Sequence, residues 1–489
     1  MPFKDFREWI SKLETEGELK RIEVKVDWDL EIAEVVRAAA SRRGPALLFE
    51  NIKDYEKGRC TRLFTGGLGS RRRIAMMLGL PKDTSREEIH RVVKKGMKEP
   101  IKPVRVTKGP VKENVVTGDQ VNLFEFPVPK WHPLDAGRYI NTFCGVVTRD
   151  PDTGVHNVGV YRGMILDRTK IGVMLIPSQH WGIHYSKYKG LQKPMPVAVV
   201  YGWDDVLPFV GGMPLSAAVC EYDVMGGLRQ APVELIGCET SDIEVPASAE
   251  IVVEGFISPD PDTYELEGPF GEASGFYGDA NTRPVLKVGC ITHRDNPIYR
   301  GQLEGMKAGV AGEGDYMGMY GQTAILWDIM ESQGVPGVVD IGMRWSFVAV
   351  SIHKTFQGQA KQVAAALWGN QVSLSFVKTV MVVEENVDVN NLSALHHAFE
   401  NYVDPKEDII VFPGGGGSNL DPSISYELRD EIKYGSAVQN KVLIDATINW
   451  LRHPERKEWG NKRYSPECTE GSPEVQQLVE RRWKEYGID

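Results

Sequence analysis

The stretch ELEGPFGEASGF, residues 265–276, places two carboxylates, Glu267 and Glu272, on either side of a Gly-Pro-Phe-Gly turn. Glycine and proline in this arrangement favour a sharp reversal of the chain. On its own such a turn is typical of a solvated surface loop in which the acidic pair has no function. The same turn can also bring both carboxylates to one cation. The rest of the sequence has to decide between these two interpretations.

Length and composition are those of an ordinary globular protein. The 489 residues suffice for two to four domains, and 42% of them are hydrophobic while 25% are charged. Lys and Arg number 57 against 67 Asp and Glu, a formal net charge of −10 that argues against a nucleic-acid or anionic-membrane partner. No apolar stretch reaches the ~18–20 residues of a membrane span, and the N-terminus lacks a signal-peptide pattern.

The six cysteines are scattered and form no C-x-x-C pair. This spacing favours reduced thiols over a disulfide framework or a zinc site. Together with the absence of targeting signals, it predicts a cytoplasmic protein.

Hydrophobic periodicity predicts an α/β (α+β) fold in three parts joined by a linker helix. Residues 1–115 alternate helix and strand signals. Residues 116–315 contain short strand-like segments without long helices between them, which favours a barrel or a sandwich. A linker helix over 316–335 leads into an α/β domain over 336–489, which ends in a helix with Ser472 at its N-cap and Pro473 at its first position.

Three polar residues in strand-like or small-residue surroundings are candidates for a metal site: Asn157, His180 and Glu221. Singly, each has an ordinary explanation, as a turn former, a core histidine and an exposed side chain respectively. Together they supply an amide oxygen, an imidazole and a carboxylate, a set that suits Mn²⁺ or Mg²⁺.

Arg162 lies five residues after Asn157 in VHNVGVYRGM, residues 155–164. If both residues were on one regular strand, they would point to opposite faces. Arg162 could form a carboxylate–guanidinium–carboxylate relay with Glu267 and Glu272. In such a relay the arginine keeps one carboxylate ionised while the other serves as a proton donor. The sequence alone leaves open whether these side chains converge.

Several segments, in the same order along the chain, resemble the UbiD-type decarboxylases, which use prenylated FMN. They are LETEGELKRIEVKVD (13–27), GPALLFENI (44–52), GSRRR (69–73), NVGVYR (157–162), QHWGIH (179–184), EGPFGE (267–272), THRDNPIY (292–299), LDPS (420–423) and KVLIDAT (441–447). The resemblance runs nearly end to end, which makes it far more specific than any single motif.

The resemblance implies both the fold and the cofactor site. The central domain would be a split β-barrel resembling flavin reductases, and the C-terminal α/β domain would mediate assembly into a homodimer or homohexamer. Asn157, His180 and Glu221 would bind Mn²⁺ (or Mg²⁺) next to K⁺ (or Na⁺) and the cofactor phosphate. The residues implied in cofactor binding are Asn157, Val158, Val160, Tyr161, Arg162, Ser178, Gln179, His180, Met213 and Glu221.

The resemblance also implies the reaction: reversible, non-oxidative decarboxylation of an aromatic, heteroaromatic or α,β-unsaturated carboxylic acid through a covalent adduct with prenylated FMN. Arg162, Glu267 and Glu272 would be catalytic, with Glu272 the proton donor. A flavin prenyltransferase would supply the cofactor. Arg300 could contact an anionic group of the substrate or be a plain surface arginine.

Two alternatives remain open at the level of sequence. The same chemistry can run in reverse, as in an arene or phenol carboxylase subunit, or the chain can be a non-catalytic assembly subunit. Two segments also depart from the family pattern, NNLSALHHAFENYVDPKED (390–408) and RGQLEGMKAGVAGEGDYMGMYG (300–321). The second of these is expected near the substrate pocket, so the identity of the substrate stays open.

Overall fold

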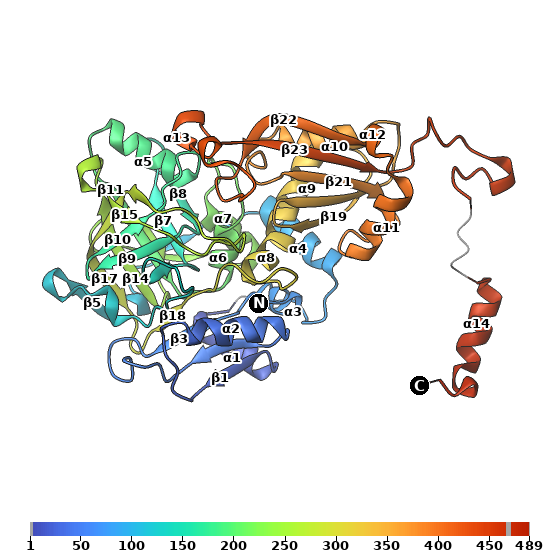
Figure 1. Ribbon diagram of the computed structural model, residues 1–489. Coiled ribbons are helices and arrows are strands. Elements are labelled where there is room, and N and C mark those ends of the chain that lie inside the picture. Colours follow the sequence, from blue (N-terminus) through green and yellow to red (C-terminus); the bar gives the residue numbers. More distant parts are fainter. Residues whose placement is uncertain (1–2, 466–470, 489) are drawn as a thin grey trace.

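The computed structural model of the chain describes residues 3–465 and 471–488 (Figure 1). The three largest of the five sheets in the described part of the chain mark its N-terminal, central and C-terminal parts, which lie below, on the left and on the right in Figure 1. This mixed α/β architecture confirms the predicted fold class.

The N-terminal part is a small sheet with helices packed around it. Its strands follow the order β1-β2-β3-β18, and the last of them comes from a segment more than 200 residues further along the chain. Its elements are α1 (Phe6–Thr15), β1 (Leu19–Ile22), α2 (Glu31–Ser41), β2 (Ala46–Phe49), β3 (Arg62–Thr65), α3 (Arg71–Met77), α4 (Arg86–Lys98) and β18 (Ile298–Arg300).

Strand pairing interlaces the N-terminal and central parts. β4 (Val104–Arg105) pairs with β12 (Glu234–Gly237), while β5 (Asn114–Thr117) pairs with β17 (Val285–His293). Strands on both sides of residue 115 therefore share sheets. The predicted domain boundaries stay a prediction.

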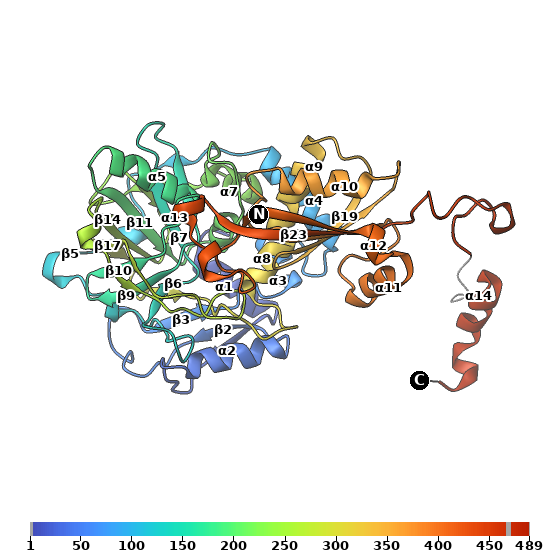
Figure 2. The same ribbon diagram turned by 45° about the horizontal axis from the view of Figure 1, so that its top comes forward.

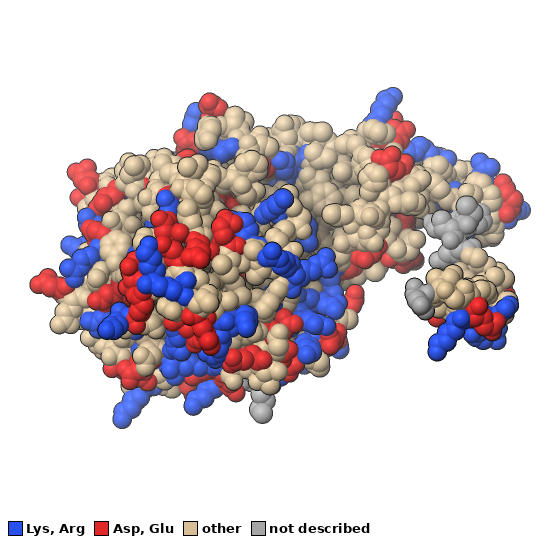
Figure 3. Space-filling model, turned by 60° about the horizontal axis from the view of Figure 1, so that its bottom comes forward, with Lys and Arg blue, Asp and Glu red and all other residues tan. Residues whose placement is uncertain are grey.

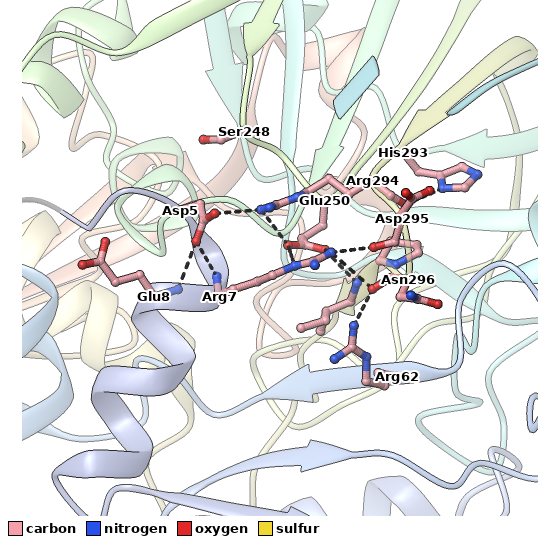
Figure 4. Close-up of polar contacts among 12 residues, drawn as sticks. Asp5, Arg7, Glu8, Arg62, Ser248, Glu250, His293, Arg294, Asp295 and Asn296 are labelled. Atoms are coloured by element: carbon pink, nitrogen blue, oxygen red, sulfur yellow. Dashed lines mark hydrogen bonds and ion pairs between the residues drawn. The ribbon is translucent and has the colours of Figure 1, made fainter. Parts of the chain in front are cut away.

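A buried ion-pair network holds the first helix against the central part (Figure 4). The fully buried Glu250 carboxylate accepts hydrogen bonds from Arg7 at 2.9 and 3.0 Å and from Arg294 at 3.3 Å. Arg294 also pairs with Asp5, the N-cap of α1, at 2.9 Å. A buried carboxylate with two guanidinium partners has its charge compensated, so this network fixes the orientation of the helix.

The central part is a nine-stranded curled sheet with the order β6-β9-β10-β17-β14-β11-β7-β8 and with β5 attached to β17. Among the described strands no pairing joins β6 to β8, so the barrel is open on one side. Its further strands are β6 (Tyr139–Asn141), β7 (Gly145–Arg149), β8 (His156–Gly159), β9 (Gly163–Asp167), β10 (Lys170–Val173), β11 (Met195–Tyr201) and β14 (Ile251–Ile257).

The short strand-like segments predicted between residues 116 and 315 are confirmed by strands that include β7, β10, β11, β14 and β17. The expectation that no long helix interrupts this region is wrong. α5 (His180–Gly190), α6 (Val206–Gly211) and α7 (Glu221–Arg229) lie between the strands. α5 has almost no apolar periodicity, because its buried residues include the polar His184 beside Trp181 and Tyr185, so the sequence carries no helical signal there.

A helical segment joins the central part to the C-terminal sheet. α8 (Glu313–Met317) continues through a π-helical turn, Gly318–Gln322, into α9 (Thr323–Ser332). π-Helical turns are uncommon and often mark functional sites.

The C-terminal sheet has the order β19-β20-β21-β23-β22. Its strands are β19 (Val338–Arg344), β20 (Phe347–Ile352), β21 (Thr379–Glu384), β22 (Ile409–Gly417) and β23 (Ala437–Ala446), and the neighbouring helices include α10 (Gln359–Trp368) and α11 (Leu392–Tyr402). α14 (Pro473–Arg482) begins as predicted, with the Ser472 hydroxyl accepting the amide hydrogen of Val475. In Figures 1 and 2 it lies apart from the rest of the chain, and none of its residues is buried.

The surface shown in Figure 3 carries Lys and Arg interspersed with Asp and Glu. In the described part of the chain no helix is both long enough and apolar enough to cross a bilayer. The five described cysteines are all free, as predicted, and Cys468 lies outside the described residues.

Candidate active site

The EGPFGE turn is buried, and two of its glycines are required by the space around them. β15 (Glu265–Glu267) ends at Glu267, which is fully buried. Gly268 has a φ of +96°, and a Cβ there would lie 2.3 Å from the Asp279 carbonyl oxygen. At Gly271 a Cβ would meet the His132 ring at 2.3 Å. The turn is therefore part of the packed interior, and the interpretation as a solvated loop is wrong.

One guanidinium joins the two carboxylates of the turn. Arg162 Nη2 donates to Glu267 Oε2 at 2.7 Å, and Nη1 donates to Glu272 Oε1. Arg162 lies between β8 and β9, in a segment that is not part of either strand. The strand-face argument that separated it from Asn157 therefore does not apply, and the structure brings the predicted catalytic residues together.

Side chains that the sequence analysis missed support this network. The Tyr139 hydroxyl on β6 donates to Glu267 Oε1 at 2.7 Å, and Arg283 Nε lies 3.0 Å from Glu267 Oε2. Asp135 accepts the amide hydrogen of Gly271 at 2.9 Å and so fixes the turn before Glu272. These residues are distant in sequence from EGPFGE, and no local pattern marks them.

The two carboxylates have different electrostatic surroundings. Burial raises the pKa of Glu272, the neighbouring Glu267 adds to this, and Arg162 opposes it without cancelling it. Glu267 instead faces two guanidinium groups, those of Arg162 and Arg283. The two carboxylates of the turn therefore differ in the cations that they face.

The three predicted metal ligands also converge. Asn157 Nδ2 lies 3.0 Å from Glu221 Oε1 and 3.3 Å from His180 Nδ1. His180 Nδ1 lies 3.6 Å from Glu221 Oε1. Glu221 is 2% exposed, so its interpretation as a surface side chain is wrong. His180 was expected at the end of a strand but is the first residue of α5, just as Glu221 is the first residue of α7.

The residues present fit a phosphate-bearing cofactor together with a divalent cation. No side chain caps the first turn of α5 or of α7, so their amide groups are available to an anion. The adjoining donor set of amide, imidazole and carboxylate suits Mn²⁺ or Mg²⁺. Among the described residues no group of three or more His, Cys, Asp and Glu side chains is placed to hold a metal ion. The candidate site therefore depends on the Asn157 amide as its third ligand.

The other residues predicted to bind the cofactor lie near the site formed by Asn157, His180 and Glu221. The Val158 amide donates to Glu221 at 2.8 Å, and the Val160 amide donates to the Gly211 carbonyl at 3.3 Å. Tyr161 stacks on Trp181 with ring centroids 4.4 Å apart. Ser178 and Gln179 directly precede α5, and Met213 follows α6. Their contact with a cofactor stays a prediction.

A cavity of about 250 Å³ lies next to the network, between the central and C-terminal parts. Ala273, which follows Glu272, lines it, as do Gly318 and Gln322 of the π-helical turn. The segment 300–321, which departs from the family pattern, contributes much of its wall. The size suits a small molecule with one ring.

Arg300 lies outside this cavity lining. Its side chain is 2% exposed, and it pairs with Asp205 at 3.0 Å and with Glu313. Its guanidinium also faces the Phe143 ring at 4.1 Å. The interpretation as a surface arginine is wrong, and the ion pairs show Arg300 holding β18 and α8 together. Its contact with a substrate stays a prediction.

The curled barrel, the buried network of Arg162, Glu267 and Glu272, and the adjoining cavity are typical of an enzyme that acts on a small molecule. Three domain descriptions of 3-octaprenyl-4-hydroxybenzoate carboxy-lyase match the chain: the N-terminal domain over residues 10–93, the Rift-related domain over 102–307 and the C-terminal domain over 315–446. The chain belongs to the UbiD family of carboxy-lyases.

Characterised relatives cover nearly the whole chain. Phenolic acid decarboxylase of Sedimentibacter hydroxybenzoicus is 32% identical over 472 residues, 93% of this chain and 94% of the relative. The closed form of the vanillic acid decarboxylase from the same organism superposes with a TM-score of 0.86 at 30% identity and covers 100% of both chains. HmfF from Pelotomaculum thermopropionicum, solved with FMN, gives a TM-score of 0.82 at 29% identity over 97% of this chain and 99% of its own.

Proposed function

We propose that this enzyme decarboxylates an aromatic, heteroaromatic or α,β-unsaturated carboxylic acid with prenylated FMN, and that Glu272 is the proton donor. The observation that carries the proposal is the single guanidinium of Arg162 between Glu267 and Glu272, beside a cavity of about 250 Å³. Loss of CO₂ from an sp² carbon would leave a carbanion too unstable at neutral pH without an electron sink. The bound cofactor supplies this sink.

The cofactor assignment is supported by a neighbour and by this chain's own residues. An evolved dimeric form of HmfF, 29% identical over 91% of this chain with a TM-score of 0.77, was solved with prenylated FMN. In this chain Asn157, His180 and Glu221 would hold Mn²⁺ or Mg²⁺, with K⁺ or Na⁺ beside it, and the first turn of α5 would receive the phosphate. The uncapped amide groups and the convergent donor set support this assignment.

The protein residues then divide the proton chemistry. Glu272 is buried, and its raised pKa keeps a proton on the carboxyl at a higher pH than in solution. Glu267 is held in place by Arg162, Arg283 and Tyr139. Arg162 positions Glu272 and can orient the departing carboxylate. Burial of the network limits access of water to the site of protonation.

The test is to purify the protein anaerobically after co-expression with a flavin prenyltransferase, with Mn²⁺ and K⁺ present. Denaturing mass spectrometry should find prenylated FMN at near-stoichiometric amounts, and aromatic acids should then release CO₂. A folded protein that retains no flavin would refute the cofactor assignment. A loaded enzyme whose Glu272→Gln variant decarboxylates at the wild-type rate would refute the proton-donor role.

The reverse reaction, carboxylation of an arene or phenol, uses the same residues. Incorporation of labelled bicarbonate into product at physiological CO₂ measures whether the enzyme runs in that direction. The hypothesis of a non-catalytic assembly subunit is set aside, because the family is one of carboxy-lyases and both residue sets are complete and convergent. A cytoplasmic location stays a prediction.

We also propose that the chain assembles as a homodimer or homohexamer through its C-terminal part. On β22, Val411 and Phe412 are 58% and 51% exposed, and Leu451 is 83% exposed. α14 and the residues after it expose further apolar side chains, such as Leu478 and Trp483, without covering the body of the chain. A second copy of the chain would bury these surfaces.

A further inference from the structure

The wall of the cavity next to Glu272 is acidic. Glu304, Asp315 and Asp421 line it, whereas none of the described Lys, Arg and His residues does so. Two of these acids have evident partners, since Asp421 pairs with Lys378 at 2.9 Å and Asp315 accepts the amide hydrogen of Gly312 at 2.8 Å. The third acid, Glu304, differs from both.

Glu304 has no cationic partner among the described residues. Its Oε1 accepts a hydrogen bond from Gln302 Nε2, and its carboxyl lies within electrostatic reach of Glu272, Asp315 and Glu313. Burial, followed by these neighbouring acids, raises its pKa to about 8. Near neutral pH the group is therefore mainly a neutral carboxylic acid, which donates one hydrogen bond and accepts others.

Gln302 gives a second, independent indication that a hydrogen-bond donor belongs in the cavity. It is 2% exposed and lines the same cavity. Its backbone N–H donates a hydrogen bond to Thr142 Oγ1 at 3.0 Å, which fixes the backbone at this position. Its side-chain Oε1 accepts no hydrogen bond within the described part of the chain. A buried acceptor without a partner is unfavourable, and a hydrogen-bond donor on a bound molecule would satisfy it.

The cavity reaches this pair, since Gly314, Gln302 and Glu304 all line it. At Gly314 in α8 a Cβ would lie 3.6 Å from Gln302 Nε2 and 3.7 Å from Glu304 Oε2, which is ordinary contact distance. The absence of a side chain there leaves room for a substituent of the substrate next to Glu304.

We infer that Glu304 and Gln302 form a specificity site for a neutral hydrogen-bond donor, such as a phenolic hydroxyl, on the part of the substrate away from the reacting carboxylate. The inference rests on the proposed function, because the reacting carboxylate would face Arg162 and Glu272. A second carboxylate on the substrate is disfavoured, since the wall supplies acids and no base to meet it. A substrate without a donor would leave buried polar groups unpaired.

The test compares matched acids on the cofactor-loaded enzyme: 3- and 4-hydroxybenzoate, their methoxy counterparts, and terephthalate. We expect kcat/KM for the better hydroxybenzoate to exceed that of its methoxy counterpart about tenfold or more, with terephthalate poorer still. Glu304→Leu should remove most of this preference, while Glu304→Gln, which keeps a donor and an acceptor, should retain it. Equal rates for hydroxy and methoxy acids in the wild type would overturn the inference, as would an unchanged preference in Glu304→Leu.

A binding measurement separates this inference from the proposed function. Phenol and anisole, which lack the reacting carboxylate, can be titrated into the loaded enzyme by calorimetry. Tighter binding of phenol that is lost in Glu304→Leu supports the specificity site even if no acid in the panel is decarboxylated. Equal binding of phenol and anisole, with decarboxylation observed, overturns the specificity site and leaves the proposed function standing.

Discussion

The raised pKa of Glu304 makes a prediction about stability that needs neither cofactor nor substrate. Below pH 4.5, the ordinary pKa of glutamic acid, Glu304 is protonated in both the folded and the unfolded chain and carries no penalty. Between pH 4.5 and about 8 the unfolded chain releases the proton while the folded chain retains it, so folding becomes less favourable as the pH rises. Glu304→Gln cannot ionise and should escape this loss.

The size of this loss of stability follows from the pH interval between the ordinary pKa of glutamic acid and the raised pKa of Glu304. Proton linkage costs about 1.4 kcal/mol per pH unit, which sets an upper limit of roughly 5 kcal/mol above pH 8. Glu304 is only partly buried, and water in the cavity screens the ionised form, so we expect about 2–3 kcal/mol. For a cooperative unit of about 200 residues this raises the unfolding midpoint by about 4–6 °C.

The assay is the thermal midpoint of wild type and Glu304→Gln between pH 5 and pH 9. The two should coincide near pH 5 and separate progressively toward pH 9, with the variant more stable. Asp421→Asn is a matched control on the same cavity wall. Burial acts to raise the pKa of Asp421, but Lys378 and Ser423 outweigh it and hold that pKa below its ordinary value. Asp421→Asn should therefore be less stable than wild type at pH 7, and the difference should fade as the pH falls toward 3. A pH-independent difference for Glu304→Gln, or the opposite sign, would refute the reasoning.

Three further predictions test other parts of the structure. Glu272→Gln in the loaded enzyme should lower the decarboxylation rate about 10²–10⁴-fold while prenylated FMN is retained, as measured by single-turnover kinetics and mass spectrometry; loss of the cofactor itself would contradict a role confined to proton transfer. His180→Ala should reduce the flavin and Mn²⁺ recovered with the purified protein, and full recovery of both would show that α5 does not bind them. Arg300→Met leaves Asp205 and Glu313 buried without their guanidinium and should destabilise the protein by about 3–5 kcal/mol in urea unfolding, whereas an unchanged midpoint would mean that the ion pairs do not hold β18 and α8 together.

Much of the architecture could be predicted locally. The central strands have apolar runs bounded by turn residues, and five of them appear where the sequence places them. Ser472 caps α14 as expected, because a hydroxyl before an exposed helix satisfies a free amide whatever the tertiary structure. Helix α7 was missed because it is buried on nearly every side, which removes the periodicity that identifies a helix, and α5 was missed because it buries polar and apolar residues together.

The candidate residues show the same division. The residue types of Asn157, His180 and Glu221 suggested metal binding, yet only the fold shows that His180 and Glu221 each begin a helix and meet across 3.6 Å. Arg300 could not be assigned from sequence, because its partners Asp205 and Glu313 are distant in the chain.

The sequence by itself determined the family, the three-part α/β organisation and the identity of the residues around EGPFGE, because these are properties of composition and of short ordered segments. The tertiary structure decided which of these residues touch one another. Arg162 reaches its two glutamates across more than 100 residues of chain, Tyr139 and Arg283 join them from separate strands, and Glu304 becomes an acid without a cation only when the cavity forms around it. Burial and long-range contacts determine the electrostatic surroundings of these side chains, and neither can be predicted from a local stretch of sequence.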